Sequence, residues 1–463
     1  MASESKIFGT SGIRGPLERV TPSFAMDLGK SLGTMLNGQG CVALGTDART
    51  SRTILQNAFV AGVVSTGVDV VLLGVAPMPT VASQSTISSI DVSIIITASH
   101  NPPTDNGFKF FVDGREFVRA EEVIIEKFLR GHRFLVARWE GVGRVIQGDP
   151  RQAYLRRARE FLLRRGGLGN GTRLLIDLAN GAATEYTPLL LEQLGFSVVT
   201  VNSHPDGHFP GRPAEPSPGN LVDTMRLAGD LDVAAALCHD GDGDRLAVID
   251  ERGNFIDQNR IIALFAKDEV ERRGSGTVVV SIDTSSVIDE VVAKAGGSVI
   301  RMPLGSLQER LASDLHDEIV FASEPWKPIF CDLGHWMDGI VGAGRIAQMI
   351  DEVGGSCQRL MASIPAYPMV REHIPCPDEL KPAFMDYVLR MLPEEMSNVE
   401  RVLNVDGVRV ECSDGSYVLV RVSGTEPKAR LYVGARTQQS LDRLVQAARI
   451  VMDHALEAAK QGI

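Results

Sequence analysis

Short apolar runs rich in β-branched residues recur between Cys41 and Ser323, and segments of helical length separate them. Val68–Leu73, Leu174–Leu178 and Val278–Asp283 are typical of these runs. Such alternation predicts parallel strands joined by crossover helices. Because 463 residues exceed what one hydrophobic core can organise, the runs should belong to several domains. We expect three similar α/β units, each with an aspartate at or beside a strand end: Asp47, Asp177 and Asp283.

The pattern changes after about Pro365. A strand near Met369–Ile374 and a helix ending near Met391 come first. Three strand-like segments and a last helix follow, at Val402–Glu411, Tyr417–Val422, Ala429–Ala435 and Ser440–Lys460. Asp414-Gly415 is typical of a tight hairpin turn, so this part is expected to be a smaller α+β domain with an antiparallel sheet. The fold class is therefore α/β, with domains expected over residues 1–150, 151–253, 254–364 and 365–463.

Three local features of the first unit are also predicted. Thr21 followed by Pro22 is typical of a helix start, because threonine caps free backbone N–H groups and proline fits the first turn. Phe108–Phe111 followed by Asp113-Gly114 indicates a hairpin at an edge of the sheet. Residues 131–150 contain glycines and show no hydrophobic period, so they are expected to link the first unit to the second.

Composition and charge exclude several classes of protein. Hydrophobic content of 44% and charged content of 23% are ordinary for a globular chain. The net charge of −11, without a run of Lys or Arg, argues against a nucleic-acid partner. No segment resembles a signal peptide or a membrane span, so a cytoplasmic location without a membrane partner is expected. The six cysteines have no CxxC spacing, which fits neither a zinc site nor a disulfide framework.

The segment Thr97–Pro102 follows the apolar run Asp91–Ile96 and continues into a second proline. Proline interrupts both a helix and a strand ladder, so Ser99 and His100 should be held on a stiff turn. In open α/β sheets, ligands bind beyond the carboxyl ends of the strands, which is where this turn is expected. The residues alone leave two interpretations open: a polar surface loop and a functional site.

An acidic loop offers a second candidate site. Asp240, Asp242 and Asp244 alternate with glycines, so their carboxylates can converge on one hard cation, and oxygen ligands favour Mg²⁺. With Glu251 at the twelfth place, the spacing also resembles an EF-hand loop. Arg245 stands where that loop needs glycine, and the flanking segments are predicted to be strands, which favours the Mg²⁺ interpretation. An acidic surface turn is the remaining alternative.

Two loops nearer the carboxyl terminus offer groups for binding anions and sugars. In one, Ser423-Gly424-Thr425 can present hydroxyls and backbone N–H groups to an anion, with Arg421 and Arg430 on either side. The other, Glu324-Pro325-Trp326-Lys327-Pro328, combines an acid, an aromatic ring and a cation with two prolines. An ordinary loop between strands and a rigid surface corner are the alternatives for these two segments.

Several stretches together resemble the motifs of the α-D-phosphohexomutase superfamily. Members of that superfamily interconvert sugar 6-phosphates and 1-phosphates, and they include phosphoglucosamine mutase, phosphomannomutase and phosphoglucomutase. The motifs occur in the family's order over essentially the whole chain. The matching stretches are FGTSGIRG (Phe8–Gly15), TASHNP (Thr97–Pro102), NGFK (Asn106–Lys109), PDGHFPGRPAEP (Pro205–Pro216), DGDGDR (Asp240–Arg245) and RVSGTEPKAR (Arg421–Arg430).

The resemblance implies four domains around a central cleft, and an isomerase acting through phosphoserine. It implies that Ser99 carries the phosphoryl group. The ligands of Mg²⁺ would be Asp240, Asp242, Asp244 and a phosphoserine oxygen of Ser99. The side chains around the transferring group would be Arg14, His100, Lys109 and Arg245. The groups holding the non-reacting phosphate would be Arg421, Ser423, Gly424, Thr425 and Arg430.

The resemblance also implies partners and an activator. Mg²⁺ and a catalytic hexose 1,6-bisphosphate are the expected cofactors, and a small phosphorylated sugar is the expected partner of a monomer or homodimer. The sugar-binding loop departs from the family pattern, which commonly has Ser-Gly-His after the acid. Only Glu324 matches here, so Glu324 and Lys327 are the expected sugar-binding residues. Lys327 or His335 would replace the missing histidine.

The opening FGTSGIRG favours glucosamine phosphate as the substrate. A phosphomannomutase or phosphoglucomutase is the first alternative. A Mg²⁺-dependent sugar phosphatase and a non-catalytic protein that binds sugar phosphate or Ca²⁺ are the others.

Overall fold

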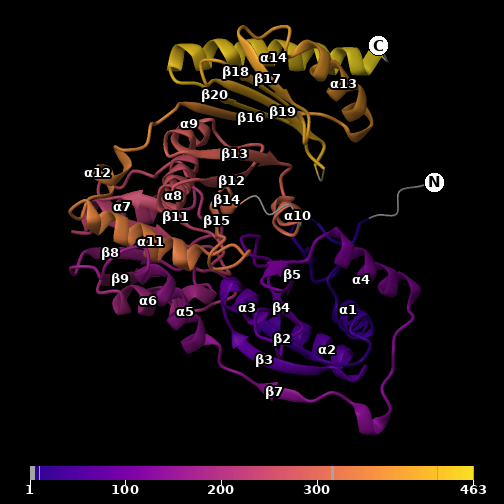
Figure 1. The fold of residues 1–463 in the computed structure, drawn as a ribbon. Coiled ribbons are helices and arrows are strands. Elements are labelled where there is room, and N and C mark those ends of the chain that lie inside the picture. Colours follow the sequence, from indigo (N-terminus) through magenta and orange to yellow (C-terminus); the bar gives the residue numbers. More distant parts are fainter. Residues whose placement is uncertain (1–5, 10, 314–317, 425, 462–463) are drawn as a thin grey trace. The chain divides into compact units, whose positions relative to one another are not determined.

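The computed structural model describes residues 6–9, 11–313, 318–424 and 426–461. Two compact units are built from interleaved stretches of the chain. The first unit comprises Met1–Gln258, Gln308–His316 and Trp326–Ser363. The second comprises Asn259–Leu307, Asp317–Pro325 and Ile364–Ile463. The colours of Figure 1 follow the sequence, so the interleaving can be traced along the ribbon.

A seven-stranded mixed sheet forms the amino-terminal part of the first unit (Figure 1). Its order is β1-β5-β4-β2-β3-β7, and β6 pairs with β5. Neighbouring strands from β4 to β7 are parallel, whereas β5 is antiparallel to β4 and β1. The strands are β1 (Ile13–Pro16), β2 (Cys41–Thr46), β3 (Asp69–Val75), β4 (Val92–Ile96), β5 (Asp105–Val112), β6 (Arg115–Glu116) and β7 (Val145–Gln147). The helices are α1 (Pro22–Met35), α2 (Arg52–Val64), α3 (Met78–Gln84), α4 (Arg119–Gly131) and the 3₁₀ turn η1 (Trp139–Gly141).

Helices pack on this sheet because strand residues alternate between its two faces. Leu44 lies in one buried cluster with Leu28 of α1 and Phe59 of α2. Gly45 has the opposite parity, and a Cβ atom there would lie 2.4 Å from a methyl carbon of Val81 in α3. The sheet is therefore covered on both faces, as the apolar run of β4 requires.

Helix α1 begins as predicted. The Thr21 side chain accepts a hydrogen bond from the backbone N–H of Phe24 at 3.1 Å, and Pro22 occupies the first helical position. Replacing such a cap by alanine typically costs about 1 kcal/mol.

The hairpin prediction is correct for the turn and wrong for the position in the sheet. Strands β5 and β6 pair across Asp113-Gly114, but β5 lies between β1 and β4 and is not an edge strand. The outer strand β1, Ile13–Pro16, is short and contains glycine, so its sequence carries no clear strand pattern. Residues 131–150 also do more than link two units, because Val145–Gln147 pairs with β3. The exposure of β7 explains why its sequence lacks an alternating pattern.

The second sheet of the first unit has the order β11-β10-β8-β9. Strand β8 is parallel to β9 and β10, and β11 is antiparallel to β10. Its strands are β8 (Arg173–Asp177), β9 (Ser197–Val201), β10 (Ala235–Cys238) and β11 (Ala247–Asp250). Associated elements are α5 (Arg151–Leu163), η2 (Ala182–Glu185), α6 (Thr187–Gln193), α7 (Val222–Asp230), β15 (Lys327–Phe330), α11 (Gly339–Glu352) and α12 (Cys357–Met361). Helices α5, α6 and α11 contact one another.

The second unit repeats the α/β pattern and then ends in an antiparallel sheet. Strand β12 is parallel to both β13 and β14. The elements of this part are α8 (Gln258–Arg273), β12 (Gly276–Ser281), α9 (Val287–Lys294), β13 (Gly297–Met302) and β14 (Ile319–Glu324). Helix α10 (Leu307–Leu311) begins in this unit at Leu307, and its other residues belong to the first unit. The antiparallel sheet has the order β16-β20-β19-β18-β17. Its elements are β16 (Met369–Pro375), η3 (Asp378–Leu380), α13 (Lys381–Met391), β17 (Val399–Leu403), β18 (Val408–Cys412), β19 (Tyr417–Val422), β20 (Lys428–Gly434) and α14 (Gln438–Gln461).

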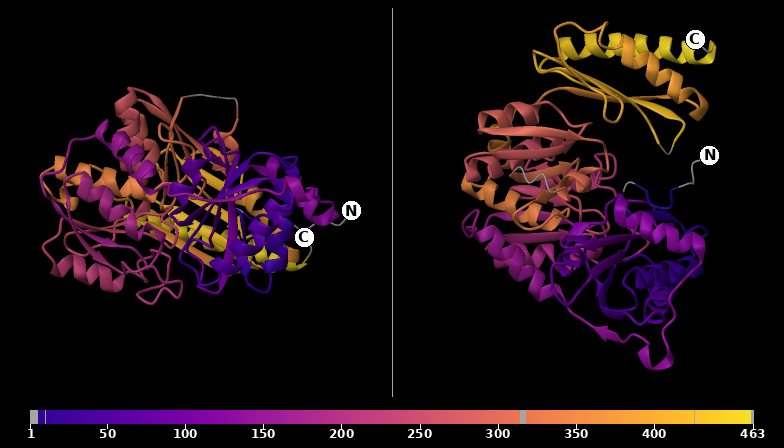
Figure 2. Two further views of the ribbon diagram at one scale, coloured as in Figure 1. Left: turned by 90° about the horizontal axis from the view of Figure 1, so that it is seen from below. Right: turned by 45° about the vertical axis from the view of Figure 1, so that its right-hand side comes forward.

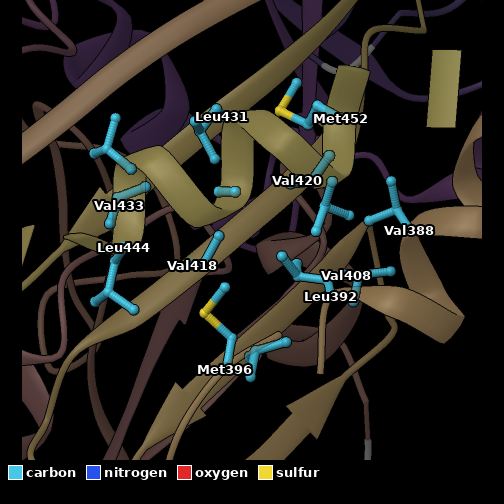
Figure 3. Close-up of a cluster of buried hydrophobic side chains, with 14 of the residues drawn as sticks. Val388, Leu392, Met396, Val408, Val418, Val420, Leu431, Val433, Leu444 and Met452 are labelled. Atoms are coloured by element: carbon cyan, nitrogen blue, oxygen red, sulfur yellow. The ribbon is translucent and has the colours of Figure 1, made fainter. Parts of the chain in front are cut away.

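One correction applies to this sheet. The segment predicted as one strand, 402–411, contains parts of two strands, because β17 and β18 form a hairpin of their own. Helices α13 and α14 lie along the same face of the sheet (Figure 2). Apolar residues from alternate strand positions, such as Val418 and Val420, pack there against Leu444 and Met452 of α14 (Figure 3). This core is what a helix-covered antiparallel sheet requires.

The predicted fold class is confirmed: three mixed α/β parts and a carboxyl-terminal antiparallel sheet. Among the described residues, no helix combines the length and the apolar character needed to cross a membrane. All six cysteines are free thiols.

Candidate active site

Ser99 lies in the first unit, immediately after the carboxyl end of β4, as its sequence position predicts. The hydroxyl of Ser99 donates a hydrogen bond to Asp240 Oδ2 at 2.7 Å. The backbone N–H of Ser99 donates to Thr97 Oγ1 at 2.8 Å. Its φ of 52° is in the left-handed region, which a residue with a side chain rarely adopts and which costs of order 1–3 kcal/mol. The surrounding structure therefore holds this serine in one defined orientation.

The acidic loop joins two antiparallel strands, β10 and β11. The sheet thus brings Asp240, Asp242 and Asp244 together, and one oxygen of each lies within 4.8 Å of the others. All three carboxylates are fully buried. Glu251, the twelfth residue of the EF-hand alternative, instead accepts hydrogen bonds from Ser356 and Gln358. The strand pairing and the position of Glu251 argue against an EF-hand.

Lys109 of β5 partly compensates these carboxylates. Its ammonium group lies 3.0 Å from Asp242 Oδ2 and 2.6 Å from Asp244 Oδ2. Burial disfavours the charged ammonium, yet Asp242 and Asp244 raise the pKa of Lys109 above its ordinary value. Burial, followed by repulsion from Asp244 and Asp242, raises the pKa of Asp240. Three buried carboxylates beside one lysine thus leave negative charge that a further cation would relieve.

The donor set fits a magnesium ion. Asp242 Oδ1 and Asp244 Oδ1 are buried and have no hydrogen-bond partner among the described residues. Buried carboxylate oxygens are costly to leave without a partner, and they are ligands that Mg²⁺ prefers.

The amino-terminal residues of two helices, α3 and α11, contact the backbone of the acidic loop. The backbone N–H of Met78, the first residue of α3, donates to the carbonyl oxygen of Asp242 at 2.8 Å. Gly339, the first residue of α11, packs so closely that a Cβ atom would lie 2.4 Å from the carbonyl oxygen of Arg245. The loop is therefore a fixed part of the fold.

His100 lies next to the serine hydroxyl and to Arg245. Arg245 Nη2 donates to His100 Nε2 at 3.1 Å, so the proton of a neutral imidazole is assigned to Nδ1. His100 Nδ1 lies 3.3 Å from Ser99 Oγ, which gives a weak contact toward the hydroxyl oxygen. Burial lowers the pKa of His100, and the positive charges of Arg245, Arg14 and Lys327 lower it further. His100 is therefore neutral at physiological pH.

Further basic groups surround the same point. Arg14 contacts the amide oxygen of Asn101 at 3.4 Å, while its buried Nε and Nη2 lack a hydrogen-bond partner among the described residues. Lys327 is also buried. Burial alone would raise the pKa of Asp244, but the positive charges of Lys109, Lys327 and Arg245 lower that pKa below its ordinary value. The structure thus brings together Ser99 and every predicted catalytic residue. It adds Lys327, which the sequence pattern predicts only for sugar binding.

The sequence does not predict a role at the site for two residues. They are Thr97, which accepts the Ser99 N–H, and Asp47, which follows β2. Thr97 Oγ1 donates to Asp47 Oδ2 at 2.7 Å. The recurrence of an aspartate after a strand is a visible signal, but the sequence does not reveal which side chains it would hold.

The predicted phosphate-binding loop lies in the second unit, between β19 and β20. Arg421 and Arg430 are directly opposite each other in this strand pair. Like charges at such positions destabilise a sheet, and Arg430 is partly compensated by Glu426, whose carboxylate lies 2.8 Å away. Arg421 contacts Asp406 at 2.8 Å, but its buried Nε has no hydrogen-bond partner in the described parts of the chain.

Other groups define the shape of this loop. Lys381 holds it by donating to the carbonyl oxygens of Ser423 at 2.5 Å and Glu426 at 2.8 Å. The space next to Gly424 is open, since an added Cβ would meet nothing within 4 Å. Thr425 lies outside the described residues. Gly424 is thus exposed in the segment between the two arginines.

The predicted sugar-binding residues differ in setting. Glu324 is buried at the end of β14 in the second unit, and its carboxylate accepts a hydrogen bond from the Gly305 N–H at 2.6 Å. Trp326, in the first unit, has a left-handed φ of 69°, and its ring lies 5.6 Å from the Arg245 guanidinium carbon. His335 pairs by its backbone with Gly114 and Arg115.

Comparison with known proteins agrees with this architecture. Four domain profiles of the phosphoglucomutase/phosphomannomutase family match in order: α/β/α domain I over residues 5–135, domain II over 153–253, domain III over 257–367 and the C-terminal domain over 374–451. The chain belongs to the phosphoglucomutase/phosphomannomutase family, within the α-D-phosphohexomutase superfamily. It is accordingly a mutase, an isomerase that transfers a phosphoryl group within its substrate.

Individual relatives carry different names. A phosphopentomutase of Thermococcus kodakarensis is 40% identical, and the match covers 98% of this chain and 100% of the relative. A probable phosphoglucosamine mutase of Methanopyrus kandleri is also 40% identical, over 94% of this chain and 95% of the relative. The crystal structure of a phosphoglucomutase/phosphomannomutase family protein from Burkholderia thailandensis has a TM-score of 0.86 and 26% identity. That match covers 99% of this chain and 98% of the other.

Proposed function

We propose that this protein is a Mg²⁺-dependent phosphosugar mutase in which Ser99 carries the phosphoryl group. The observation that carries the proposal is the buried contact of 2.7 Å between Ser99 Oγ and Asp240 Oδ2. A phosphorylated Ser99 would have no hydroxyl proton to donate, and its oxygen would repel Asp240. A divalent cation among Asp240, Asp242 and Asp244 would remove that repulsion and add a phosphoserine oxygen to its ligands.

The proposed reaction has two transfers. In the first, a free hydroxyl of the sugar monophosphate attacks the phosphorus of phosphoserine. A new O–P bond forms as the bond from Ser99 Oγ to phosphorus breaks. The proton lost by the sugar hydroxyl is balanced by the proton that Ser99 Oγ gains. After the resulting bisphosphate turns end for end, the second transfer returns its other phosphoryl group to Ser99.

The basic side chains of the site would stabilise the transferring group. Phosphoryl transfer needs mainly positioning and charge stabilisation. Two nitrogens of Arg14 without a hydrogen-bond partner in the described structure, together with the charges of Lys109 and Arg245, would supply this, and Lys327 would add a further charge. Neutral His100 would act as a hydrogen-bond donor through Nδ1. Mg²⁺, when bound, would neutralise charge on the phosphoryl oxygens.

The second unit would hold the non-reacting phosphate. Arg421 and Arg430 stand opposite each other, and Ser423 and Gly424 offer a hydroxyl and an open backbone turn between them. Thr425 belongs to the same proposed group. Because these groups would contact only the phosphate and not the sugar, they would bind either phosphate of a bisphosphate.

The preferred sugar is proposed from the amino-terminal motif and from the relatives. The opening FGTSGIRG and the relative from Methanopyrus kandleri favour glucosamine phosphate. The name of the Thermococcus kodakarensis relative makes a pentose phosphate the first competitor, followed by mannose and glucose phosphates. Glu324 and Lys327 are the residues proposed to contact the sugar.

The decisive experiment is a coupled assay of glucosamine, mannose, glucose and pentose phosphates, each started with its bisphosphate and Mg²⁺. We expect conversion between the two monophosphates, and loss of that conversion in Ser99→Ala. Ser93→Ala is the matched control, since Ser93 is a buried serine of β4 whose hydroxyl has no hydrogen-bond partner in the described structure. Full activity of Ser99→Ala would refute the proposal. Net release of inorganic phosphate would identify a phosphatase, and tight binding without turnover would identify a binding protein.

A further inference from the structure

Arg49 is buried beneath the serine loop, with 1% of its surface exposed. Its guanidinium group donates hydrogen bonds to four backbone carbonyl oxygens of that loop. The acceptors are Ser99 at 3.0 Å, Asn101 at 2.7 Å, Pro102 at 2.5 Å and Asp105 at 2.9 Å. One side chain thus ties together both ends of the turn that carries Ser99.

Asp47 fixes the guanidinium in turn. Arg49 Nε lies 3.0 Å from Asp47 Oδ2, and the backbone N–H of Arg49 donates to Asp47 Oδ1 at 2.9 Å. The same carboxylate accepts the Thr97 hydroxyl, whose oxygen accepts the Ser99 N–H. The serine is therefore connected to Asp47 by two routes, through Arg49 and through Thr97.

The segment that follows β9 closes over the other side of Arg49. The ring of Phe209 lies 5.2 Å from the guanidinium carbon, within the range of a cation–π contact. Gly207 fits against the backbone of residues 48–50, where a Cβ atom would lie 2.4 Å from the nitrogen of Thr50. Gly241 of the acidic loop would likewise bring a Cβ within 2.8 Å of the Ser99 carbonyl oxygen. The serine loop is thus enclosed between Arg49 and the acidic loop.

We propose that Arg49 is a positioning residue that holds Ser99 at the distance and angle phosphoryl transfer requires. The proposal rests on the proposed function, since it takes Ser99 as the phosphoryl carrier. All three side-chain nitrogens of Arg49 already bond to protein atoms, so its role is to orient the serine rather than to bind substrate. The left-handed backbone of Ser99 needs such restraint, because a strained conformation persists only where several contacts enforce it.

Lysine cannot replace arginine in this role. The guanidinium group offers five N–H donors in a rigid plane, which matches four carbonyl oxygens and a carboxylate. An ammonium group has three donors, so Arg49→Lys keeps the charge and loses part of the network. A small displacement of a reacting group can lower the rate roughly a hundredfold.

The test compares Arg49→Lys with Arg165→Lys. Arg165 is another buried arginine of the first unit, paired with Asp332 and stacked on Phe161, and it has no part in the proposed site. We expect Arg49→Lys to lower kcat, and the single-turnover rate of Ser99 phosphorylation by bisphosphate, roughly a hundredfold. KM should stay near the wild-type value. Hydrogen exchange should rise in residues 97–107. Arg165→Lys should lower the melting temperature alone.

The outcomes separate the positioning role of Arg49 from the role of Ser99 as phosphoryl carrier. Wild-type phosphorylation kinetics in folded Arg49→Lys would overturn the role of Arg49 while leaving Ser99 as the carrier. A rise in KM without a fall in kcat would also overturn it. Absence of phosphate on Ser99 in the wild-type enzyme would instead refute the proposed function. If Arg49→Lys does not fold, Phe209→Leu removes only the covering ring, and an unchanged single-turnover rate in that variant would overturn the proposal.

Discussion

At the scale of single residues, the site combines full burial with charge that is only partly compensated. Asp242 and Asp244 each direct one oxygen to Lys109 and leave the other without a protein partner in the described residues. Two buried nitrogens of Arg14 likewise have no hydrogen-bond partner among the described residues. Such groups are costly in a fold, so their presence together argues for ligands that pair with them, a cation for the carboxylates and a phosphoryl group for the arginine.

Asp338 gives a prediction about the pH dependence of stability. It caps α11, next to the acidic loop, and accepts hydrogen bonds from Tyr154 and Trp336. Burial raises the pKa of Asp338 to about 6 from 3.8. Because the folded state holds this proton more tightly, the contribution of Asp338 is full below about pH 4 and is lost as the pH rises through about 6.

The contribution of Asp338 to the free energy of unfolding changes by about 3 kcal/mol across this pH range, at 1.36 kcal/mol for each pKa unit. We expect the stability difference between wild type and Asp338→Asn, measured by urea unfolding, to shrink as the pH rises across this window. Asparagine does not titrate, so other groups cancel in the comparison. An equal pH dependence in both proteins would contradict the assignment.

Much of the residue-level site could be predicted from the sequence. The residues around Ser99 leave a polar loop and a functional site open, and its role as phosphoryl carrier follows only from the family resemblance. The spacing of Asp240, Asp242 and Asp244 predicts that their carboxylates converge, and the structure brings them together. The contact of Arg49 with the serine loop and its contact with Phe209 could not be predicted, because these partners lie 50 or more residues from Arg49 in the chain and only the folded chain brings them together. Lys327 was predicted as a sugar ligand, whereas the structure shows that it is buried and that its charge lowers the pKa of Asp244 in the acidic loop.

At the scale of elements, strand ends and helix starts position the reacting groups. The Ser99 loop follows β4, the acidic loop joins β10 and β11, and both meet at the carboxyl ends of parallel strands. The buried strands were predictable from their apolar runs. Strand β7 was not predictable because its residues are exposed. The sequence pattern predicts one strand over 402–411, whereas β17 and β18 pair as a hairpin across a turn near Asp406-Gly407.

Gly339→Ala tests the packing of α11 against the acidic loop. A Cβ atom at this position would lie 2.4 Å from a backbone oxygen of Arg245, so the loop would have to move. We expect a higher Mg²⁺ concentration for half-maximal activity and a loss of about 1–3 kcal/mol in stability. Gly131→Ala in α4 is the control, since an added Cβ there meets nothing within 4 Å. Unchanged Mg²⁺ dependence in a stable Gly339→Ala enzyme would show that the contact does not set the loop.

At the scale of the whole molecule, the chain divides the proposed work between its two units. The first contains the serine, the aspartates and most of the cations. The second contains the loop with Arg421 and Arg430. The order of these motifs was predictable over the whole length and agrees with the four matching domain profiles. The motif FGTSGIRG predicts glucosamine phosphate, and this stays a prediction because the sugar-binding loop departs from the family pattern.

Arg430→Gln tests the role assigned to the second unit. Loss of a charge-assisted hydrogen bond to phosphate is worth about 1.5–3 kcal/mol, which corresponds to a KM roughly ten- to a hundredfold higher. We expect kcat to change less, since Arg430 would contact the phosphate that does not react. Arg401→Gln, an exposed arginine of the same sheet, should leave both constants near wild type. Steady-state kinetics would contradict this assignment if Arg430→Gln lowered kcat and left KM unchanged.

The most direct measurement of the central claim is the location of the phosphoryl group. Enzyme incubated with the matching sugar bisphosphate and Mg²⁺, then quenched, should gain the mass of one phosphoryl group, and the modified peptide should contain Ser99. Added sugar monophosphate should remove that mass, and Ser99→Ala should never acquire it. Turnover by an enzyme whose peptide containing Ser99 stays unmodified, or phosphate on another residue, would contradict the account.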